Sequence, residues 1–340
     1  MKRRLAIVLL LASVLLLSTG WTAVMDTNVN ISGDSEADTY YIDVNVATVW
    51  SKPNITREVD EPSTTNPADP RKWTSSMSYQ DKIGLVGKLE TQALYGSQVT
   101  VLERQGDWVK VAVHNQFTPR NSAGYPGWVP AAQLSREPSY ENQHHRPFAL
   151  VTSPTAWLYN DKHTTEEFLE LSFNTRLPVM QEFDDEVLVA TPSHGMKWLK
   201  KADVSIYNAQ EDIPEPTGED IVNTGKKFMS LPYLWAGTSG FGFDCSGFTY
   251  SIHAANGIYI PRDSSVQARY GTPVAWEDLQ PGDLLFYANK GGTGNVHHVG
   301  VYIGDGKMLH SPNSSTHVRI DDIVTSGWIS EFAGARRYVK

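Results

Sequence analysis

The 340-residue sequence has a single cysteine, Cys245, which excludes an internal disulfide. It has no basic surplus either, because 38 acidic residues outnumber 29 Lys and Arg and leave a net charge of −9. That charge, without a basic stripe, argues against nucleic acid as a partner. The longest apolar run, residues 5–17, falls short of the ~20 residues that a membrane-spanning helix needs. We therefore expect no stable membrane span once a signal is removed.

The N-terminus has the order of a secretory signal. Three basic residues at 2–4 precede the apolar run, and small residues follow it. We predict a signal peptide over residues 1–23, a flexible leader over 24–38, and a secreted or cell-wall-associated protein. A single free cysteine is unusual in an exported protein, and nucleophilic catalysis would explain why this one is present.

Alternating β-type patterns fill most of the first two thirds of the chain. They predict a small barrel over residues 39–137, with a Pro-rich insertion at 53–88, and a second barrel over 145–207. A weak internal repeat supports the pair, since short strand patterns at 99–102, 108–113 and 127–129 are echoed at 177–180, 186–190 and 197–199.

The last third has a different organisation. A Pro-rich linker at 208–217 leads to a helix from Thr217 to about Met229 and a second helix over 246–256. Strand patterns follow at 284–287, 298–303, 307–310 and 335–339. Helices followed by an antiparallel sheet predict an α+β domain over residues 218–340.

Cys245 lies where a Gly-rich, aromatic loop enters the second of these helices. Backbone N–H groups and the helix dipole favour an anion there, so we expect a lowered thiol pKa and a nucleophilic cysteine. The alternative is that Cys245 is only a small buried hydrophobic residue.

A catalytic cysteine requires a base and a group that orients the base. His298 begins an apolar strand and His310 ends the next one. A two-residue turn at Asp305-Gly306 would point His310 away from His298, so the pair requires a longer loop or a bulge. Zinc is the rival chemistry, but no carboxylate or second cysteine has ligand-like spacing nearby. We predict neither metal nor cofactor.

Five motifs carry a resemblance over residues 215–340, and they occur in this order: Phe-Asp-Cys-Ser-Gly-Phe (243–248), Pro-Arg-x-Ser (261–264), Pro-Gly-Asp-Leu (281–284), His-Val-Gly-Val-Tyr-Ile-Gly (298–304) and His310. Together they resemble the NlpC family of papain-like cell-wall cysteine peptidases. The resemblance implies that Cys245 is the nucleophile, His298 the base and His310 its orienting partner. It also implies that Tyr233 lies near the oxyanion site. The barrels resemble bacterial SH3-like domains, which in exported enzymes commonly bind or frame cell-wall peptides.

Family members with tandem SH3-like barrels resemble γ-D-glutamyl-L-diamino-acid endopeptidases of peptidoglycan stem peptides. This implies peptidoglycan-derived peptides as partners of a monomeric enzyme, with Trp235, Asp244, Ser246 and Ser264 around the peptide. If the first barrel packs against the catalytic domain, we expect Glu90 and Tyr125, at loop positions, to bind the free amine of an N-terminal L-Ala together with Asp244. The protein would then release L-Ala-γ-D-Glu as a dipeptidyl-peptidase. Alternatives are an endopeptidase on intact wall, an acyl-transfer enzyme and a wall-binding protein.

Overall fold

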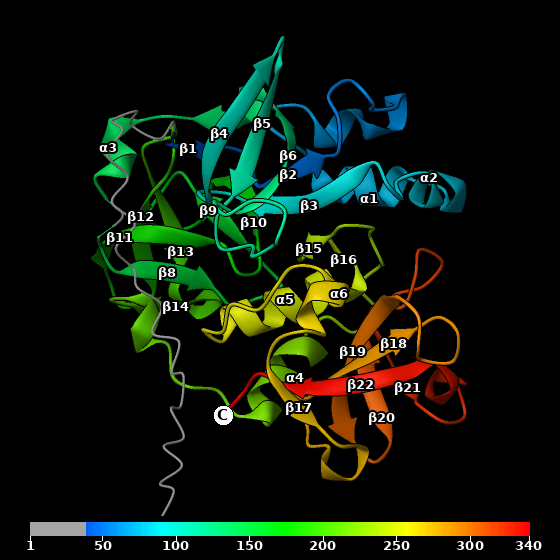
Figure 1. The fold of residues 1–340 in the computed structure, drawn as a ribbon. Helices are drawn as coiled ribbons and strands as arrows, with labels where there is room; N and C mark the ends of the chain where they lie inside the picture. The colour runs from blue at the N-terminus through cyan, green and yellow to red at the C-terminus, as the bar shows by residue number, and fades with distance from the viewer. Residues whose placement is uncertain (1–38, 144) are drawn as a thin grey trace, which may run out of the picture. The chain divides into compact units, whose positions relative to one another are not determined.

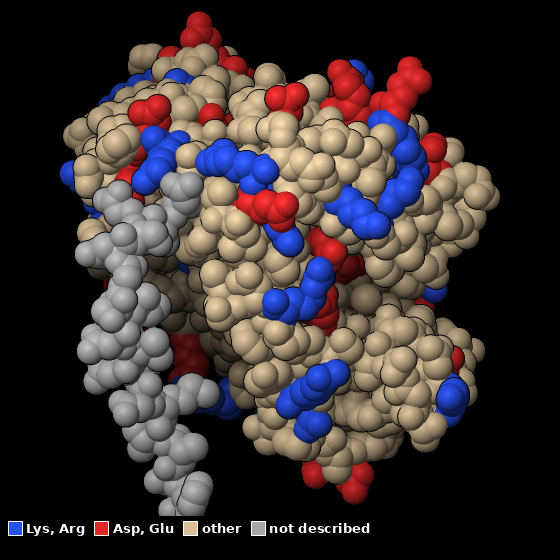
Figure 2. All heavy atoms as spheres, turned by 45° about the horizontal axis from the view of Figure 1, so that its top comes forward, with Lys and Arg blue, Asp and Glu red and all other residues tan. Residues whose placement is uncertain are grey.

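The computed structural model describes residues 39–143 and 145–340. The predicted signal peptide and leader lie outside the described residues. Within those residues, no helix has the length and apolar character to cross a membrane. Basic and acidic side chains are intermixed over the face drawn in Figure 2.

The first barrel is a seven-stranded antiparallel sheet (Figure 1). Its strands are β1 (Thr39–Ile42), β2 (Val46–Trp50), β3 (Leu89–Leu94), β4 (Gln98–Gln105), β5 (Trp108–Val113), β6 (Tyr125–Pro130) and β7 (Leu134–Ser135), and a 3-10 turn, η2 (Ala131–Gln133), precedes β7. The spatial order is β3-β2-β6-β5-β4-β1-β7. Alternate side chains point inward, so Val109, Val111 and Val113 of β5 share one buried cluster.

The predicted insertion joins β2 to β3 and has helical structure of its own. It contains η1 (Glu58–Ser63), α1 (Pro70–Ser76) and α2 (Tyr79–Ile83). Trp73 of α1 is fully buried, packs against Trp50 of β2 with ring centroids 6.5 Å apart, and donates its indole N–H to Asp60 at 3.0 Å. The insertion is therefore packed onto the barrel.

The second barrel repeats the first strand for strand. After α3 (Pro138–Glu141) come β8 (Phe148–Val151), β9 (Thr155–Tyr159), β10 (Glu167–Ser172), β11 (Arg176–Glu182), β12 (Glu186–Ala190), β13 (Met196–Lys200), η3 (Lys201–Asp203) and β14 (Val204–Tyr207). The order β10-β9-β13-β12-β11-β8-β14 is the first order with seven added to each number. The repeat predicted from sequence is confirmed as a repeat of topology.

The remaining residues form the α+β domain. Its helical elements are η4 (Gln210–Asp212), α4 (Gly218–Lys226), α5 (Cys245–Ala255), α6 (Ser264–Gln267), η5 (Trp276–Asp278) and η6 (Trp328–Glu331). A short hairpin, β15 (Thr238–Ser239) and β16 (Gly242–Phe243), precedes α5, and the main sheet contains β17 (Thr272–Val274), β18 (Leu284–Ala288), β19 (Val296–Gly304), β20 (Lys307–His310), β21 (Arg319–Asp322) and β22 (Phe332–Arg337). That sheet is antiparallel, in the order β17-β22-β18-β19-β20-β21.

Local sequence explains the two longer helices of this domain. Thr217 caps α4 through a reciprocal capping box with Asp220, as the sequence predicts. In α5, Phe248 and Ile252 are four residues apart and lie in one buried cluster with Ile221 of α4 and Val299 and Val301 of β19. Both helices therefore pack on β19, in the middle of the sheet, and this packing holds the start of α5 near the strand that carries His298.

Candidate active site

Cys245 is the first residue of α5, and Asp244 caps the helix. The Asp244 carboxylate accepts the backbone N–H of Gly247 at 2.5 Å. A Cβ added to Gly247 would lie 1.9 Å from the carbonyl oxygen of Gly237, so only glycine lets the loop that leads into β15 approach this turn. The loop and the cap together fix the direction in which the thiol points.

The expectation of a lowered thiol pKa is wrong. Burial, followed by the negative charge of Asp244, raises the pKa of Cys245 to about 12, against the opposing effect of hydrogen bonds from the Val299 and Ser246 backbone. The Asp244 carboxylate accepts the Gly247 N–H at this helix N-terminus, so its negative charge opposes a thiolate at the helix end where the dipole alone would favour one. In the free protein Cys245 is a neutral thiol and needs a base.

His298 and His310 meet across neighbouring strands. Val301 pairs with Leu309 and Tyr302 with Met308, so His310 lies opposite Gly300 and diagonal to His298. A register shift between Tyr302 and Gly304 provides the bulge that the sequence argument requires. The His298 Nε2 and His310 Nδ1 atoms are 2.8 Å apart.

Gly300 makes room for this pair. A Cβ at that position would come within 3.2 Å of the His310 Cβ and 2.9 Å of the Met308 sulfur. Burial lowers the pKa of His298 well below its usual value, so the imidazole is neutral near pH 7. Cys245 and His298 line one cavity, and a neutral imidazole there can take the proton of a neutral thiol as it attacks.

A cavity of about 350 Å³ opens onto Cys245. Nine of the ten residues singled out from sequence line it: Glu90, Tyr125, Tyr233, Trp235, Asp244, Cys245, Ser246, Ser264 and His298. The tenth, His310, is fully buried behind His298. Burial raises the pKa of Tyr233 well above 10, so its hydroxyl stays protonated and able to donate.

The first barrel supplies one wall of this cavity through Glu90 and Tyr125. Both were expected in loops, but Glu90 lies within β3 and Tyr125 begins β6. Strands hold them more firmly than loops would. The Tyr125 hydroxyl donates to both carboxylate oxygens of Asp263, at 3.0 and 2.9 Å, and Glu90 forms an ion pair with Arg120.

Arg262 is a residue that the sequence argument missed. Its side chain is 1% exposed and its guanidinium donates to Asp244 at 2.8 Å, to the Ser246 hydroxyl at 2.9 Å and to the Thr91 hydroxyl of β3 at 3.0 Å. It therefore connects the first barrel to the turn that carries Cys245. The sequence signal was present in the motif Pro-Arg-x-Ser, but nothing in it indicated burial.

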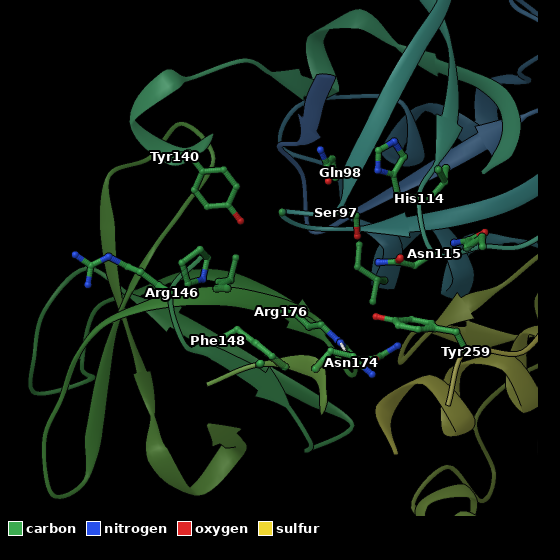
Figure 3. A pocket seen from close by; sticks show the side chains of 18 of the residues that line it. Ser97, Gln98, His114, Asn115, Tyr140, Arg146, Phe148, Asn174, Arg176 and Tyr259 are labelled. Carbon is green, nitrogen blue, oxygen red and sulfur yellow. Dashed lines mark hydrogen bonds between the residues drawn. The ribbon is translucent and has the colours of Figure 1, made fainter. Parts of the chain in front are cut away.

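A larger cavity, of about 590 Å³, lies elsewhere (Figure 3). Side chains from both barrels and the α+β domain line it, among them His114, Arg176 and Tyr259. Neither Cys245 nor His298 reaches it. Volume alone would not select the smaller cavity, although that cavity is the one lined by both Cys245 and His298. Over the described part of the chain, no cluster of three or more His, Cys, Asp or Glu side chains could hold a metal ion.

Comparison with known proteins shows which family the chain belongs to. The NlpC/P60 family model matches residues 230–337. A Bacillus cereus protein named gamma-D-glutamyl-L-lysine dipeptidyl-peptidase is 52% identical over 90% of this chain and 92% of its own length. The chain belongs to the NlpC/P60 family of cysteine peptidases.

Other relatives of this NlpC/P60 enzyme extend the match to the barrels. A Bacillus subtilis protein of the same name is 39% identical over 86% of the chain and 96% of its own length. A crystal structure of a B. cereus NlpC/P60 family protein superposes with a TM-score of 0.86 at 51% identity, covering 89% of this chain and all of that one. Models of a bacterial dipeptidyl-peptidase SH3 domain and of a YKFC SH3b2 domain match residues 86–134 and 151–207. The predicted architecture, two SH3-like barrels before a papain-like α+β domain, is confirmed.

Proposed function

We propose that this enzyme hydrolyses the bond between the D-glutamate side-chain carboxyl and the following diamino acid in peptidoglycan stem peptides. In this proposal it releases L-Ala-γ-D-Glu from peptides with a free N-terminal L-Ala, and it acts outside the cell membrane. The observation that carries the proposal is the wall of the Cys245 cavity contributed by the first barrel. The names of the two Bacillus relatives, quoted above, support the same reaction.

The charges around the cavity favour a substrate with an ammonium group at this wall. Three carboxylates line it, those of Glu90, Asp244 and Asp263. Arg262 pairs with Asp244 and Arg120 with Glu90, so among the described residues the Asp263 carboxylate has only the neutral Tyr125 hydroxyl as its direct hydrogen-bond partner. A substrate ammonium would provide the missing positive charge. Asp263, which sequence reasoning did not select, joins Glu90 and Tyr125 as a candidate.

The chemistry follows from the neutral Cys245–His298 pair. His298 takes the thiol proton as sulfur attacks the γ-carbonyl, and the Tyr233 hydroxyl with the Cys245 backbone N–H stabilises the oxyanion. His298 then gives that proton to the leaving amine as the C–N bond breaks and a thioester remains. Water, deprotonated by His298, cleaves the thioester and restores the thiol. The other cavity residues, Trp235, Ser246 and Ser264, would contact the peptide.

The test uses L-Ala-γ-D-Glu-L-Lys and its N-acetylated form, with products identified by mass spectrometry. The native protein should release L-Ala-γ-D-Glu from the free tripeptide and leave the acetylated one largely intact. Cys245→Ala should release nothing yet still bind the tripeptide, and His298→Ala should lose about 10²–10⁴-fold in kcat. Equal cleavage of both peptides would end the dipeptidyl-peptidase proposal and favour an endopeptidase on intact wall. Activity in Cys245→Ala would end the mechanism.

A further inference from the structure

His310 does not end the chain of polar contacts that begins at His298. Its Nε2 atom lies 3.0 Å from Oδ2 of Asp321, on the edge strand β21. His310 pairs with Arg319 in the β20–β21 ladder, so Asp321, two residues further, is its diagonal neighbour on the same face. The relation is the same as that between His298 and His310 one strand earlier. His298, His310 and Asp321 therefore form a row of polar side chains across the neighbouring strands β19, β20 and β21.

Asp321 is held as a carboxylate. The hydrogen bond from His310 and the contacts from Arg319, whose Nε and Nη2 atoms lie 2.9 Å from the two carboxylate oxygens, hold its pKa well below the usual value. An ionised carboxylate can only accept hydrogen bonds. The proton between His310 and Asp321 is therefore on the imidazole, at Nε2.

The position of the hydrogen on His310 determines the position of the hydrogen on His298. Burial lowers the pKa of His310, so the ring is neutral and carries a single N–H. Since that hydrogen is on Nε2, the His310 Nδ1 must accept, and the 2.8 Å contact requires a donor at His298 Nε2. A neutral His298 protonated at Nε2 has a bare Nδ1, which is the form needed to take the Cys245 proton.

Trp328 contacts both ends of this row, His298 and Asp321. Its indole N–H donates to Asp321 Oδ2 at 3.2 Å, while its ring stacks on His298 with centroids 4.5 Å apart and planes 21° apart. The opposite tautomer of His298 would not change this stacking. Trp328 therefore controls the plane of the imidazole, and Asp321 controls where the hydrogens lie.

We propose that Asp321 and Trp328 are positioning residues of this enzyme: Asp321 sets the tautomers of His310 and His298, and Trp328 fixes the His298 ring plane and the Asp321 carboxylate. The catalytic consequence rests on the proposed function. The tautomer assignment does not, because it concerns the free protein.

The test replaces Asp321 by Asn, which has the same shape but can also donate through its amide. An Asn that donates to His310 Nε2 would reverse both tautomers and place a hydrogen on His298 Nδ1. We expect kcat for the free tripeptide to fall by about 10²-fold, the lower end of the range for general-base help, with KM little changed. In ¹⁵N NMR of the imidazole nitrogens, native His298 and His310 should each be protonated at Nε2, and Asp321→Asn should show a second tautomer.

The matched control is Asp322→Asn. Asp322 is the next residue on β21, but its carboxylate accepts from Val324 and Thr325 in the following turn. This variant should keep the native tautomers and kcat. Trp328→Phe, which keeps a stacked ring and loses only the indole N–H, should lose less activity than Trp328→Leu.

Native tautomers together with native kcat in a folded Asp321→Asn protein would overturn the proposal. So would equal activity of the Phe and Leu variants at Trp328. If the native protein cleaved no tripeptide, the proposed function would fail, and the NMR measurement would still decide the tautomers. Loss of kcat with unchanged tautomers would reduce Asp321 to a structural residue.

Discussion

The two barrels have the same strand order and different uses. Glu90 and Tyr125 of the first barrel line the cavity of Cys245, and no residue of the second barrel does so among those described. The second barrel contacts the α+β domain at residues outside this cavity, where the Ser172 hydroxyl accepts the N–H of Gly240 at 2.9 Å and Arg176 donates to the Ala254 carbonyl at 2.7 Å. Topology alone therefore says nothing about which barrel shapes the site.

The difference lies in where each barrel joins the catalytic domain, because Arg262, which the first barrel contacts, lines the Cys245 cavity. In the first barrel, the Gln92 amide oxygen accepts the backbone N–H of Thr238 at 3.0 Å, and Thr91 accepts from Arg262. Buried polar groups of this kind must find their partners, so they fix the register between barrel and catalytic domain. The first barrel is thereby positioned as part of the enzyme.

The largest expected effect comes from removing Arg262, which connects the first barrel to the catalytic domain. Arg262→Met would leave Asp244 as a buried carboxylate without its cation, next to Cys245. We expect a loss of about 3–5 kcal/mol in the free energy of unfolding, measured by urea denaturation, together with loss of peptidase activity.

The contrast to Arg262 is Arg71, which pairs with Glu170 and so links the insertion of the first barrel to the second barrel. The Arg71 side chain is 62% exposed, so Arg71→Met should cost less than about 1 kcal/mol and leave activity unchanged. Similar losses for the two variants would show that the two joints are equivalent.

A second prediction tests whether the first barrel selects substrates with a free N-terminal amine. Glu90→Gln keeps the shape of the side chain and removes the charge proposed to face the substrate amine. The variant should lose kcat/KM for the free tripeptide by the equivalent of about 2–5 kcal/mol, mostly in KM, and so lose its preference over the acetylated peptide. The control is Glu167→Gln, on β10, which corresponds to β3 in the second barrel. A retained preference in Glu90→Gln would remove the amine subsite from the first barrel.

Sequence alone predicted the elements of the catalytic domain that carry Cys245, His298 and His310. Each lies in a locally recognisable pattern, a loop-to-helix junction or the end of an apolar strand. Even the bulge near Ile303 could be anticipated, because alternation forbids the pair without it.

Asp321 and Arg262 could not be found in the same way. Asp321 depends on the register of β21, and residues 311–318 between β20 and β21 have no regular pattern that would fix it. Arg262 depends on burial, which is a property of three-dimensional packing. The raised pKa of Cys245 was missed for the same reason, since desolvation outweighs a favourable helix end.

The smallest expected effect is a gain in stability at the same wall. Burial raises the pKa of Asp263, so folding favours its protonated form and the ionised carboxylate destabilises the fold near pH 7. Asp263→Asn should raise the free energy of unfolding by no more than about 1 kcal/mol, the scale of one hydrogen bond, while raising KM for the free tripeptide. For an acid with a raised pKa the native state binds more protons than the unfolded state, so wild-type stability falls as pH rises through the folded pKa. The gain of the variant over wild type should therefore shrink on acidification.

The control variant lies in the second barrel. There Asp203 accepts the Ser153 hydroxyl at 2.9 Å, and Asp203→Asn should bring no gain in the free energy of unfolding and no change in KM. A loss of stability in Asp263→Asn at pH 7, or equal behaviour of the two variants, would mean that Asp263 supports the fold and has no part in amine binding.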